Sequence, residues 1–319
     1  MENTTALLSV RNLKKYFHTP AGILHAVDNI NIDIFENETL GVVGESGCGK
    51  STLGRAILRL HEPTSGEVWF RGENILTYGS ARLKKLRSEM QIIFQDPYAS
   101  LNPRMTVSQA IAAPLIIQGL YDKRDHAGIN KRVAEMMETV GLASRLVNAY
   151  PHELDGGRRQ RIGIARALAL NPKFIVCDEP VSALDVSIQA QVLNLMQDLQ
   201  EQMGLTYMFI THNLSVVKHL SNHIVVMYLG QLVEKGTPSQ LFNSPLHPYT
   251  RALLSAIPIP DPDIKMKREI IKGELTSPIN VGHGCRFAAR CPIASERCSK
   301  EDPILSEHEP GHFVACHHS

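Results

Sequence analysis

Hydrophobic and polar residues alternate along three stretches in the first quarter of the chain. These stretches are residues 7–17, 27–35 and 66–75. Alternation with a period of two is typical of strands that bury one face and leave the other in water, and such strands usually form antiparallel sheets. The pattern therefore predicts an antiparallel β-subdomain at the N-terminus.

Other stretches are short and continuously apolar, or apolar at helical spacing. The apolar runs 40–43, 90–94, 174–177 and 205–210 predict buried strands, and 224–228 with 231–234 predicts a hairpin around Gly230. Helices are predicted within residues 53–60, 81–89, 107–149, 192–203 and 239–257. Strands that alternate with helices indicate an α/β core with a parallel sheet. The long helical stretch indicates an α-helical subdomain, about residues 96–165, inserted into that core.

A glycine-rich segment follows the first buried strand. It contains the pattern G-x-x-x-x-G-K-S, which is the P-loop when a strand precedes it and a helix follows. The glycines let the backbone turn its N–H groups inward around phosphates, and the helix adds its dipole. Lys50 is expected to contact the outer phosphates, and the Ser51 hydroxyl to bind Mg²⁺. The alternative is a chance match in a glycine-rich turn. The predicted nucleotide-binding residues are Gly44, Glu45, Ser46, Gly47, Cys48, Gly49, Lys50, Ser51 and Thr52.

Two more strands end in residues suited to nucleotide hydrolysis. Asp178 and Glu179 follow the run 174–177. We expect Asp178 to hold Mg²⁺ and Glu179 to polarise the attacking water, the alternative being a solvated strand end. His212 follows the run 205–210, where it can sense a γ-phosphate or serve a structural role.

Tyr16, in the first alternating stretch, is a candidate platform for a purine ring. Stacking of a base on an aromatic ring needs no base-specific contact. An ordinary aromatic residue of the sheet is the simpler interpretation of Tyr16.

Bulk properties restrict the class of protein. The 33 basic and 32 acidic residues nearly balance, which argues against a nucleic-acid partner. No apolar run reaches the roughly 20 residues of a membrane helix, and the first residues lack a signal peptide. We therefore expect a cytosolic protein with reduced thiols. The proline-rich stretch 257–263 predicts a stiff linker between an ATPase domain, 6–257, and a C-terminal extension, 258–319.

The extension contains four of the six cysteines, Cys285, Cys291, Cys298 and Cys316. Four thiolates in a short, loop-rich segment can hold an iron–sulfur cluster or a zinc ion, or remain free. The other two cysteines have simpler interpretations, Cys48 as a filler of the P-loop and Cys177 as a buried strand residue.

Taken in order, these motifs resemble the ATP-binding subunit of an ABC transporter over about residues 6–250. The resemblance identifies residues 44–52 as Walker A, 174–179 as Walker B, His212 as the switch histidine and Tyr16 as the A-loop aromatic. It adds Gln95 as the Q-loop residue and a further Mg²⁺ ligand beside Ser51 and Asp178. It also adds Leu154-Asp155-Gly156-Gly157-Arg158 as the signature and Asp185 as the D-loop aspartate.

Three segments further resemble the dipeptide/oligopeptide/nickel importer branch, and within it the second of two paired ATPases. They are residues 42–52, 95–104 and 247–250. This resemblance implies a [4Fe–4S] cluster on the four late cysteines. It implies ATP hydrolysis that powers import, at the cytoplasmic face of the membrane, with two membrane permease subunits and an extracytoplasmic binding protein. Peptide, nickel chelate and other solutes remain alternatives for the cargo.

The signature departs from the family pattern Leu-Ser-Gly-Gly-Gln at Asp155 and Arg158. An ionised Asp155 facing a γ-phosphate would repel it, which predicts a second, non-identical ATPase subunit that supplies an intact signature. The alternative is that Asp155 and Arg158 pair with each other and leave the phosphate alone. Two other functions compete: a soluble ABC ATPase without a transporter, and a regulatory partner that binds ATP without hydrolysing it.

Overall fold

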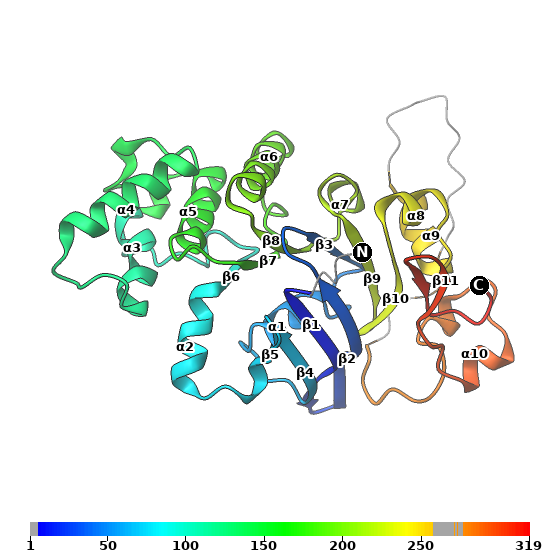
Figure 1. Ribbon diagram of the computed structural model, residues 1–319. Coiled ribbons are helices and arrows are strands. Elements are labelled where there is room, and N and C mark those ends of the chain that lie inside the picture. The colour runs from blue at the N-terminus through cyan, green and yellow to red at the C-terminus, as the bar shows by residue number, and fades with distance from the viewer. Residues whose placement is uncertain (1–5, 258–270, 272, 274–276) are drawn as a thin grey trace, which may run out of the picture. The chain divides into compact units, whose positions relative to one another are not determined.

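The computed structural model describes residues 6–257, 271, 273 and 277–319 (Figure 1). The chain divides into two compact units. One unit contains the described residues up to Leu76 together with those from Phe209 onwards, and the other contains Thr77–Met208. Apart from Ile257, the predicted linker 257–263 lies outside the described residues.

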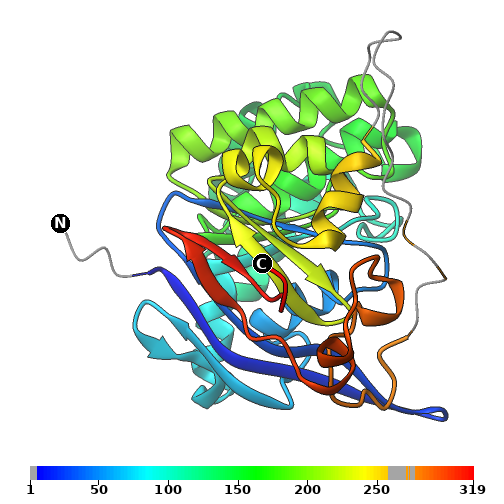
Figure 2. The same cartoon turned by 90° about the vertical axis from the view of Figure 1, so that its right-hand side faces the viewer.

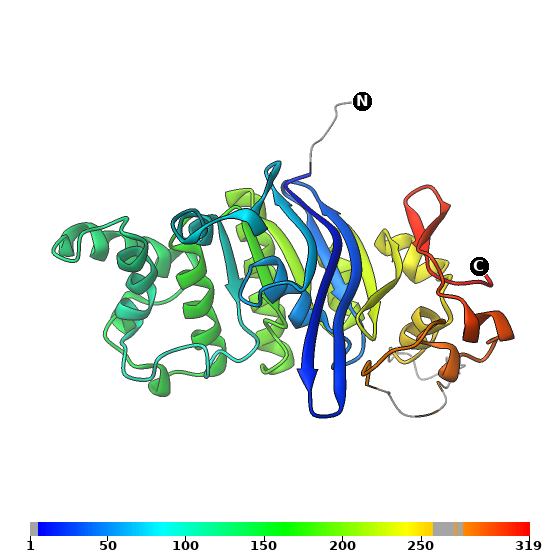
Figure 3. The same cartoon turned by 90° about the horizontal axis from the view of Figure 1, so that it is seen from below.

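The first unit begins with a four-stranded antiparallel sheet, which confirms the prediction for the N-terminus. Its strand order is β2-β1-β4-β5. The long hairpin of β1 (Leu8–Thr19) and β2 (Gly22–Ile34) is the blue pair in Figure 3. The predicted strand 66–75 is instead β4 (Ser65–Phe70), the short β5 (Glu73–Asn74) and a 3₁₀ turn, η1 (Ile75–Thr77). It is divided because Arg71 and Gly72 both have positive φ, so the chain reverses there.

The same unit contains the strand that leads into the P-loop. β3 (Thr39–Val43) pairs in parallel with β9 (His223–Tyr228), and β10 (Gln231–Gly236) returns beside β9 as the predicted hairpin. Its helices are α1 (Lys50–Ile57), α7 (Leu214–Leu220), α8 (Pro238–Asn243) and α9 (Pro248–Ser255). The predicted helical stretch 239–257 thus forms two helices, α8 and α9, whereas α7 was not predicted.

The C-terminal residues extend this sheet, which the sequence did not predict. After η4 (Ala288–Arg290) and α10 (Glu296–Lys300), strands β11 (Ser306–Glu309) and β12 (His312–Val314) form a hairpin. β12 pairs antiparallel with β10, and Figure 2 shows the red hairpin beside it. The fully buried Glu234 carboxylate accepts hydrogen bonds from Leu246 N, His247 N and His312 Nε2, at 2.8, 3.0 and 2.8 Å. One buried acid therefore ties the hairpin to the start of α9.

The second unit is mostly helical. Strands β6 (Met90–Ile93) and β7 (Phe174–Asp178) pair in parallel, and β8 (Thr206–Ile210) crosses the division between the units. Its helices are α2 (Ser80–Glu89), α3 (Val107–Gln118), α4 (His126–Thr139), α5 (Gly156–Leu168) and α6 (Val186–Met203), with 3₁₀ turns η2 (Ser144–Leu146) and η3 (Pro151–Glu153). The first helix of the predicted helical stretch 107–149 is α3, which ends at Gly119. The φ of Gly119 is 77°, in the left-handed region that commonly terminates a helix.

Candidate functional site

Residues 44–52 form a tight loop between β3 and α1, as the P-loop pattern predicts. Gly44, Gly47 and Gly49 all have positive φ. A side chain at Gly44 would meet Met227 O at 2.2 Å, and one at Gly49 would meet Ala26 O at 2.0 Å. Only glycine can adopt these positive φ angles without strain and also leave room for the neighbouring carbonyl oxygens. The loop is therefore fixed by backbone packing against β2 and β9.

Lys50 lies inside this loop. It is 4% exposed, and its ammonium donates hydrogen bonds of 2.9 Å to Gly44 O and to Glu45 O. These two acceptors are neutral carbonyls, so a bound phosphate would be favoured beside the ammonium. Burial raises the pKa of the Cys48 thiol although Lys50 opposes the shift, which suits the role of a neutral filler.

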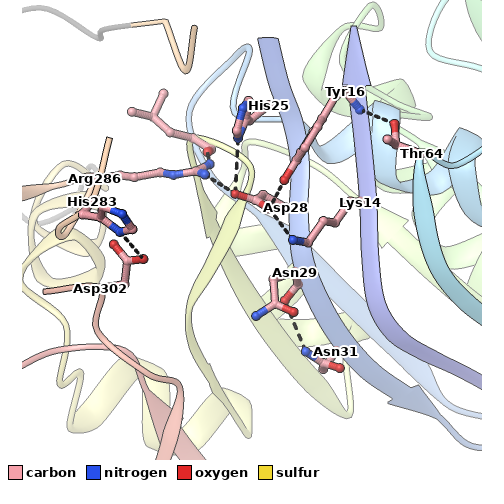
Figure 4. A network of polar contacts seen from close by, with 11 residues as sticks. Lys14, Tyr16, His25, Asp28, Asn29, Asn31, Thr64, His283, Arg286 and Asp302 are labelled. Atoms are coloured by element: carbon pink, nitrogen blue, oxygen red, sulfur yellow. Dashed lines mark hydrogen bonds and ion pairs between the residues drawn. The ribbon is translucent and has the colours of Figure 1, made fainter. Parts of the chain in front are cut away.

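The predicted base platform, Tyr16, lies in a network of polar contacts within the same unit (Figure 4). Its hydroxyl donates to Asp28 Oδ1 at 2.6 Å, and its ring stacks on His25 with centroids 4.0 Å apart. Burial raises the pKa of Tyr16, and the hydrogen bond to Asp28 raises it further. Asp28 also pairs with Arg286 from the C-terminal segment. Sequence reasoning missed both Asp28 and Arg286.

His212 lies in the exposed loop after β8. The neighbouring Thr211 N donates to Val42 O at 3.1 Å, which places this loop beside the end of β3. His212 and the P-loop thus follow two neighbouring strands at the same edge of the sheet, as the parallel pattern implies.

The second unit holds the predicted hydrolytic carboxylates. Asp178 is 1% exposed at the end of β7, and Glu179 follows it with a φ of 48°, a strained conformation for a non-glycine residue. Gln95 Nε2 donates to Glu179 Oε2 at 2.9 Å. The structure therefore brings together the Q-loop residue and the expected catalytic carboxylate.

Asp155 and Asp185 both act as helix N-caps in this unit. Asp155 accepts from Arg158 N at 2.8 Å at the start of α5, and its other oxygen lies 3.4 Å from Arg158 Nε. Asp185 accepts from Ile188 N at 3.1 Å at the start of α6. Asp155 therefore pairs with Arg158, which is the alternative that the sequence left open.

The signature glycines permit close packing. A side chain at Gly156 would lie 3.0 Å from Leu184, and one at Gly157 would lie 2.5 Å from Ile188. Close approach of the segment that carries Asp185 explains both glycines without a nucleotide.

The four late cysteines gather in the C-terminal segment of the first unit. Cys285 N donates to Cys298 O at 2.7 Å, and His318 Nε2 lies 3.6 Å from Cys298 Sγ. Burial raises the pKa of Cys285 to about 11, and the other three thiols add to the shift. All six cysteines lie in the described residues and all are free thiols. Among the described residues, no group of three or more His, Cys, Asp or Glu side chains is arranged to hold a metal ion.

Comparison with known proteins gives two family matches. Residues 27–182 match the family described as ABC transporter, and residues 233–298 match the family described as Oligopeptide/dipeptide transporter, C-terminal region. The second match includes three of the four late cysteines, Cys285, Cys291 and Cys298. Within the described part of the chain, no helix is both long and apolar enough to cross a membrane.

Individual relatives cover nearly the whole chain. The Putative oligopeptide transport ATP-binding protein YkfD of Bacillus subtilis (strain 168) is 54% identical over 98% of this chain and 95% of its own. The Oligopeptide transport ATP-binding protein OppF of Escherichia coli (strain K12) is 53% identical over 96% and 92%. Among solved structures, the dimeric post-hydrolysis state of the ATP-binding cassette MJ0796 bound to ADP and Pi matches with a TM-score of 0.66 and 30% identity, over 72% of this chain and 98% of that one.

Proposed function

The chain belongs to the ABC transporter ATP-binding proteins, in the group with the oligopeptide/dipeptide C-terminal region, and we propose that it hydrolyses ATP to power the import of peptides. The observation that supports the proposal is the P-loop, in which the three glycines and the buried Lys50 form a tight loop after β3 that would suit a phosphate. The match to the transporter C-terminal region favours peptide import over a soluble ABC ATPase and over nickel or another solute as cargo.

Each site residue has a proposed role in this reaction. The backbone N–H groups of residues 44–52 and the Lys50 ammonium would bind the phosphates, and Tyr16 would stack on the base. Mg²⁺ would neutralise phosphate charge, held by Ser51, Gln95 and Asp178. Glu179 would orient and deprotonate the attacking water, with His212 hydrogen-bonded to the γ-phosphate. Asp155, Gly156, Gly157 and Asp185 would contribute to the site of a second ATPase subunit.

The catalytic roles are tested with Glu179→Gln and Lys50→Ala in the assembled transporter. Removal of a positioned base typically slows turnover by about 10²–10⁴-fold, so Glu179→Gln should keep ATP binding and lose hydrolysis. Lys50→Ala should weaken binding itself, because it removes a charge from the phosphate site. Glu201→Gln, an exposed glutamate of α6, is the matched control. An unchanged hydrolysis rate in Glu179→Gln would reject its role as the base.

The substrate class is tested by uptake. Membrane vesicles with the assembled transporter should import labelled oligopeptides when ATP is supplied on the cytoplasmic face, and Glu179→Gln should abolish this import. The same vesicles should not import nickel chelates. Nickel uptake without peptide uptake would contradict the proposed cargo.

For partners, we propose two membrane permease subunits, an extracytoplasmic substrate-binding protein and a second, non-identical ATPase subunit, with this chain bound peripherally at the cytoplasmic face. The names of relatives as oligopeptide transport proteins support the transporter assembly. The altered signature, Asp155 with Arg158, supports the non-identical ATPase, because two copies of this chain would place that signature at both sites.

The isolated chain should therefore bind ATP and hydrolyse it slowly. The double variant Asp155→Ser/Arg158→Gln should hydrolyse ATP faster than the unaltered chain. The measurement is the steady-state ATPase rate of both proteins against that of the full complex. Equal rates at the level of the complex would remove the argument for a non-identical partner.

For the tail, we propose a [4Fe–4S] cluster held by Cys285, Cys291, Cys298 and Cys316. Support comes from the gathering of four free thiols in one small segment, in which Cys285 N donates to Cys298 O at 2.7 Å. A zinc ion on the same thiolates is the alternative. The described residues contain no group of three or more His, Cys, Asp or Glu side chains arranged to hold a metal ion, and this counts against the cluster and against zinc alike. When bound, the cluster would supply a covalent staple for a segment with little apolar core.

Protein purified without oxygen should be brown and contain iron and acid-labile sulfide in equal amounts. Cys298→Ser should lose both, whereas Cys177→Ala, a buried strand cysteine outside the tail, should keep them. A colourless protein with one zinc per chain would reject the cluster.

A further inference from the structure

Asp28, in β2, is one of the points where the N-terminal sheet and the C-terminal segment meet. Its carboxylate accepts the Tyr16 hydroxyl and pairs with the guanidinium of Arg286 (Figure 4). Lys14 Nζ and His25 Nδ1 lie farther away, at 3.9 and 3.5 Å. Burial alone would raise the pKa of Asp28, but the Tyr16 hydrogen bond and the Arg286 charge outweigh it and lower the pKa. The carboxylate is therefore ionised and held from both sides.

Arg286 is built into the protein rather than lying on its surface. Its side chain is 6% exposed, against 12% for Asp28, and it also donates to Leu229 O. The two pair although 258 residues separate them in the chain. A fixed guanidinium fixes the carboxylate, and the carboxylate in turn fixes the Tyr16 hydroxyl.

A second arginine of the tail contacts the P-loop. Arg290 donates from Nη1 to Glu45 Oε2 at 2.8 Å and from Nη2 to Glu45 Oε1 at 3.2 Å, and its side chain is 9% exposed. On the other side, Glu45 N donates to the Tyr249 hydroxyl at 2.8 Å. Glu45 is thus held through its side chain by the tail and through its backbone by α9.

We propose that Arg286 and Arg290 are positioning residues of the ATP site: Arg286 orients the Tyr16 ring through Asp28, and Arg290 orients the P-loop through Glu45. The proposal rests on the proposed function, because it concerns the site at which ATP would bind. The C-terminal segment would thus contribute to nucleotide affinity. Arg286 would act on the contact with the base, and Arg290 on the contacts with the phosphates.

The physical reason is preorganisation. A tyrosine ring rotates about two side-chain bonds, and a base can stack on it only in a narrow range of orientations. The 2.6 Å bond to Asp28 and the stack on His25 remove that freedom before the ligand arrives. Affinity then rises because less conformational entropy is lost on binding.

The first test uses Tyr16→Phe, which keeps the ring and loses only the hydroxyl. Loss of one hydrogen bond corresponds to about two- to tenfold in affinity. We expect that loss for ATP and no change for tripolyphosphate, which has no base, when both are titrated into the full chain. Arg286→Met should show the same selectivity, and the double variant should lose no more than either single one. Arg286→Lys should recover part of the affinity.

Arg290→Met should weaken ATP and tripolyphosphate alike, since the P-loop binds the phosphates of both. Arg297→Met is the matched control, because Arg297 belongs to the same segment but pairs with Glu301 on the surface, both about 60% exposed. A merely structural role would weaken both ligands equally in every variant.

Unchanged ATP affinity in Tyr16→Phe and Arg286→Met, with Lys50→Ala still deleterious, would overturn the positioning role and leave the proposed function standing. Additive losses in the double variant would also overturn it. Absence of ATP binding by the unaltered chain would overturn both proposals together. Tyr16→Phe removes no charge and only one half-buried oxygen, so the test still decides the question even if Arg286→Met does not fold.

Discussion

Two aspartate–arginine pairs of this protein have the same chemistry and opposite surroundings. Asp28 and Arg286 are 12% and 6% exposed and connect segments 258 residues apart. Asp155 and Arg158 are 57% and 49% exposed and lie within one turn of α5. Burial holds Asp28 and Arg286 together, because separating them would leave two buried charges with neither a partner nor water to solvate them. Solvent lets the second exchange partners at little cost, because exposed pairs contribute at most about 1 kcal/mol.

The contrast separates two uses of a charge pair. A buried pair suits a permanent tie between distant segments, such as the tail and the N-terminal sheet. An exposed pair suits a surface that must rearrange when an anion or another subunit arrives. Asp155 keeps the N-cap of α5 in place of the usual Ser, because both residues accept a hydrogen bond at a helix N-cap.

The largest expected effect on stability comes from disrupting the buried pair of Asp28 and Arg286. Asp28→Asn removes the negative charge beside Arg286 and should lower the free energy of unfolding by about 3–5 kcal/mol, the usual cost of an uncompensated buried charge. The measurement is urea denaturation of the full chain at neutral pH, with Asp155→Asn as the exposed counterpart. Equal losses in the two variants would show that burial does not distinguish the pairs.

A buried titratable group without a charged partner sharpens the comparison. Burial lowers the pKa of His247 from 6.5 to about 4, with the Arg251 charge adding to it. The folded state therefore keeps His247 neutral while the unfolded chain takes up a proton below pH 6.5. The contribution of neutral His247 to the free energy of unfolding is fully present above pH 6.5. It is lost as the pH falls towards 4, and the loss amounts to at most about 3 kcal/mol.

The corresponding variant is His247→Asn. Asparagine can still accept the N-cap hydrogen bond from Tyr249 N, so the variant should flatten the dependence of stability on pH between 6.5 and 4. Urea denaturation across that pH range checks it, with the surface variant His283→Asn as the control. A slope identical to that of the unaltered protein would show that His247 does not bind the proton.

The smallest effects belong to the exposed pair. Asp155→Ala removes an N-cap and should cost about 1 kcal/mol, whereas Asp155→Ser keeps the cap and should cost less than about 0.5 kcal/mol. Arg158→Gln should also stay within about 0.5 kcal/mol. Thermal unfolding of the three variants ranks their losses of unfolding free energy. A larger loss for Arg158→Gln than for Asp155→Ala would mean that the ion pair contributes more to stability than the N-cap.

The parts predictable from sequence are those in which nearby residues determine the outcome. The P-loop conformation depends on Gly44, Gly47 and Gly49 within one segment, and the β1–β2 hairpin follows from alternation within each strand. The position of Asp178 and Glu179 at the end of a buried strand also followed from adjacent residues, whereas their catalytic roles stay predictions.

The ties made by Arg286 and Arg290 were not predictable, because each partner lies more than 240 residues away in the chain. No local pattern marks which of the 33 basic residues is buried against which acid. The hairpin of β11 and β12 was missed for the same reason. All four residues of β11 are exposed, and the hairpin joins the sheet only through the pairing of β12 with β10.

The separation of Asp28 from Arg286 also has a consequence for synthesis of the chain. At about 5–20 residues per second, a ribosome needs roughly 13–50 s to add the 258 residues between them. Throughout that time the nascent N-terminal sheet lacks its tail, and β10, once made, lacks β12 as a neighbour. β10 ends at Gly236 and β12 begins at His312, so this edge strand stays open for roughly 4–15 s at the same rate. An open edge strand invites pairing with other chains, so the nascent polypeptide should depend on chaperones until β12 emerges.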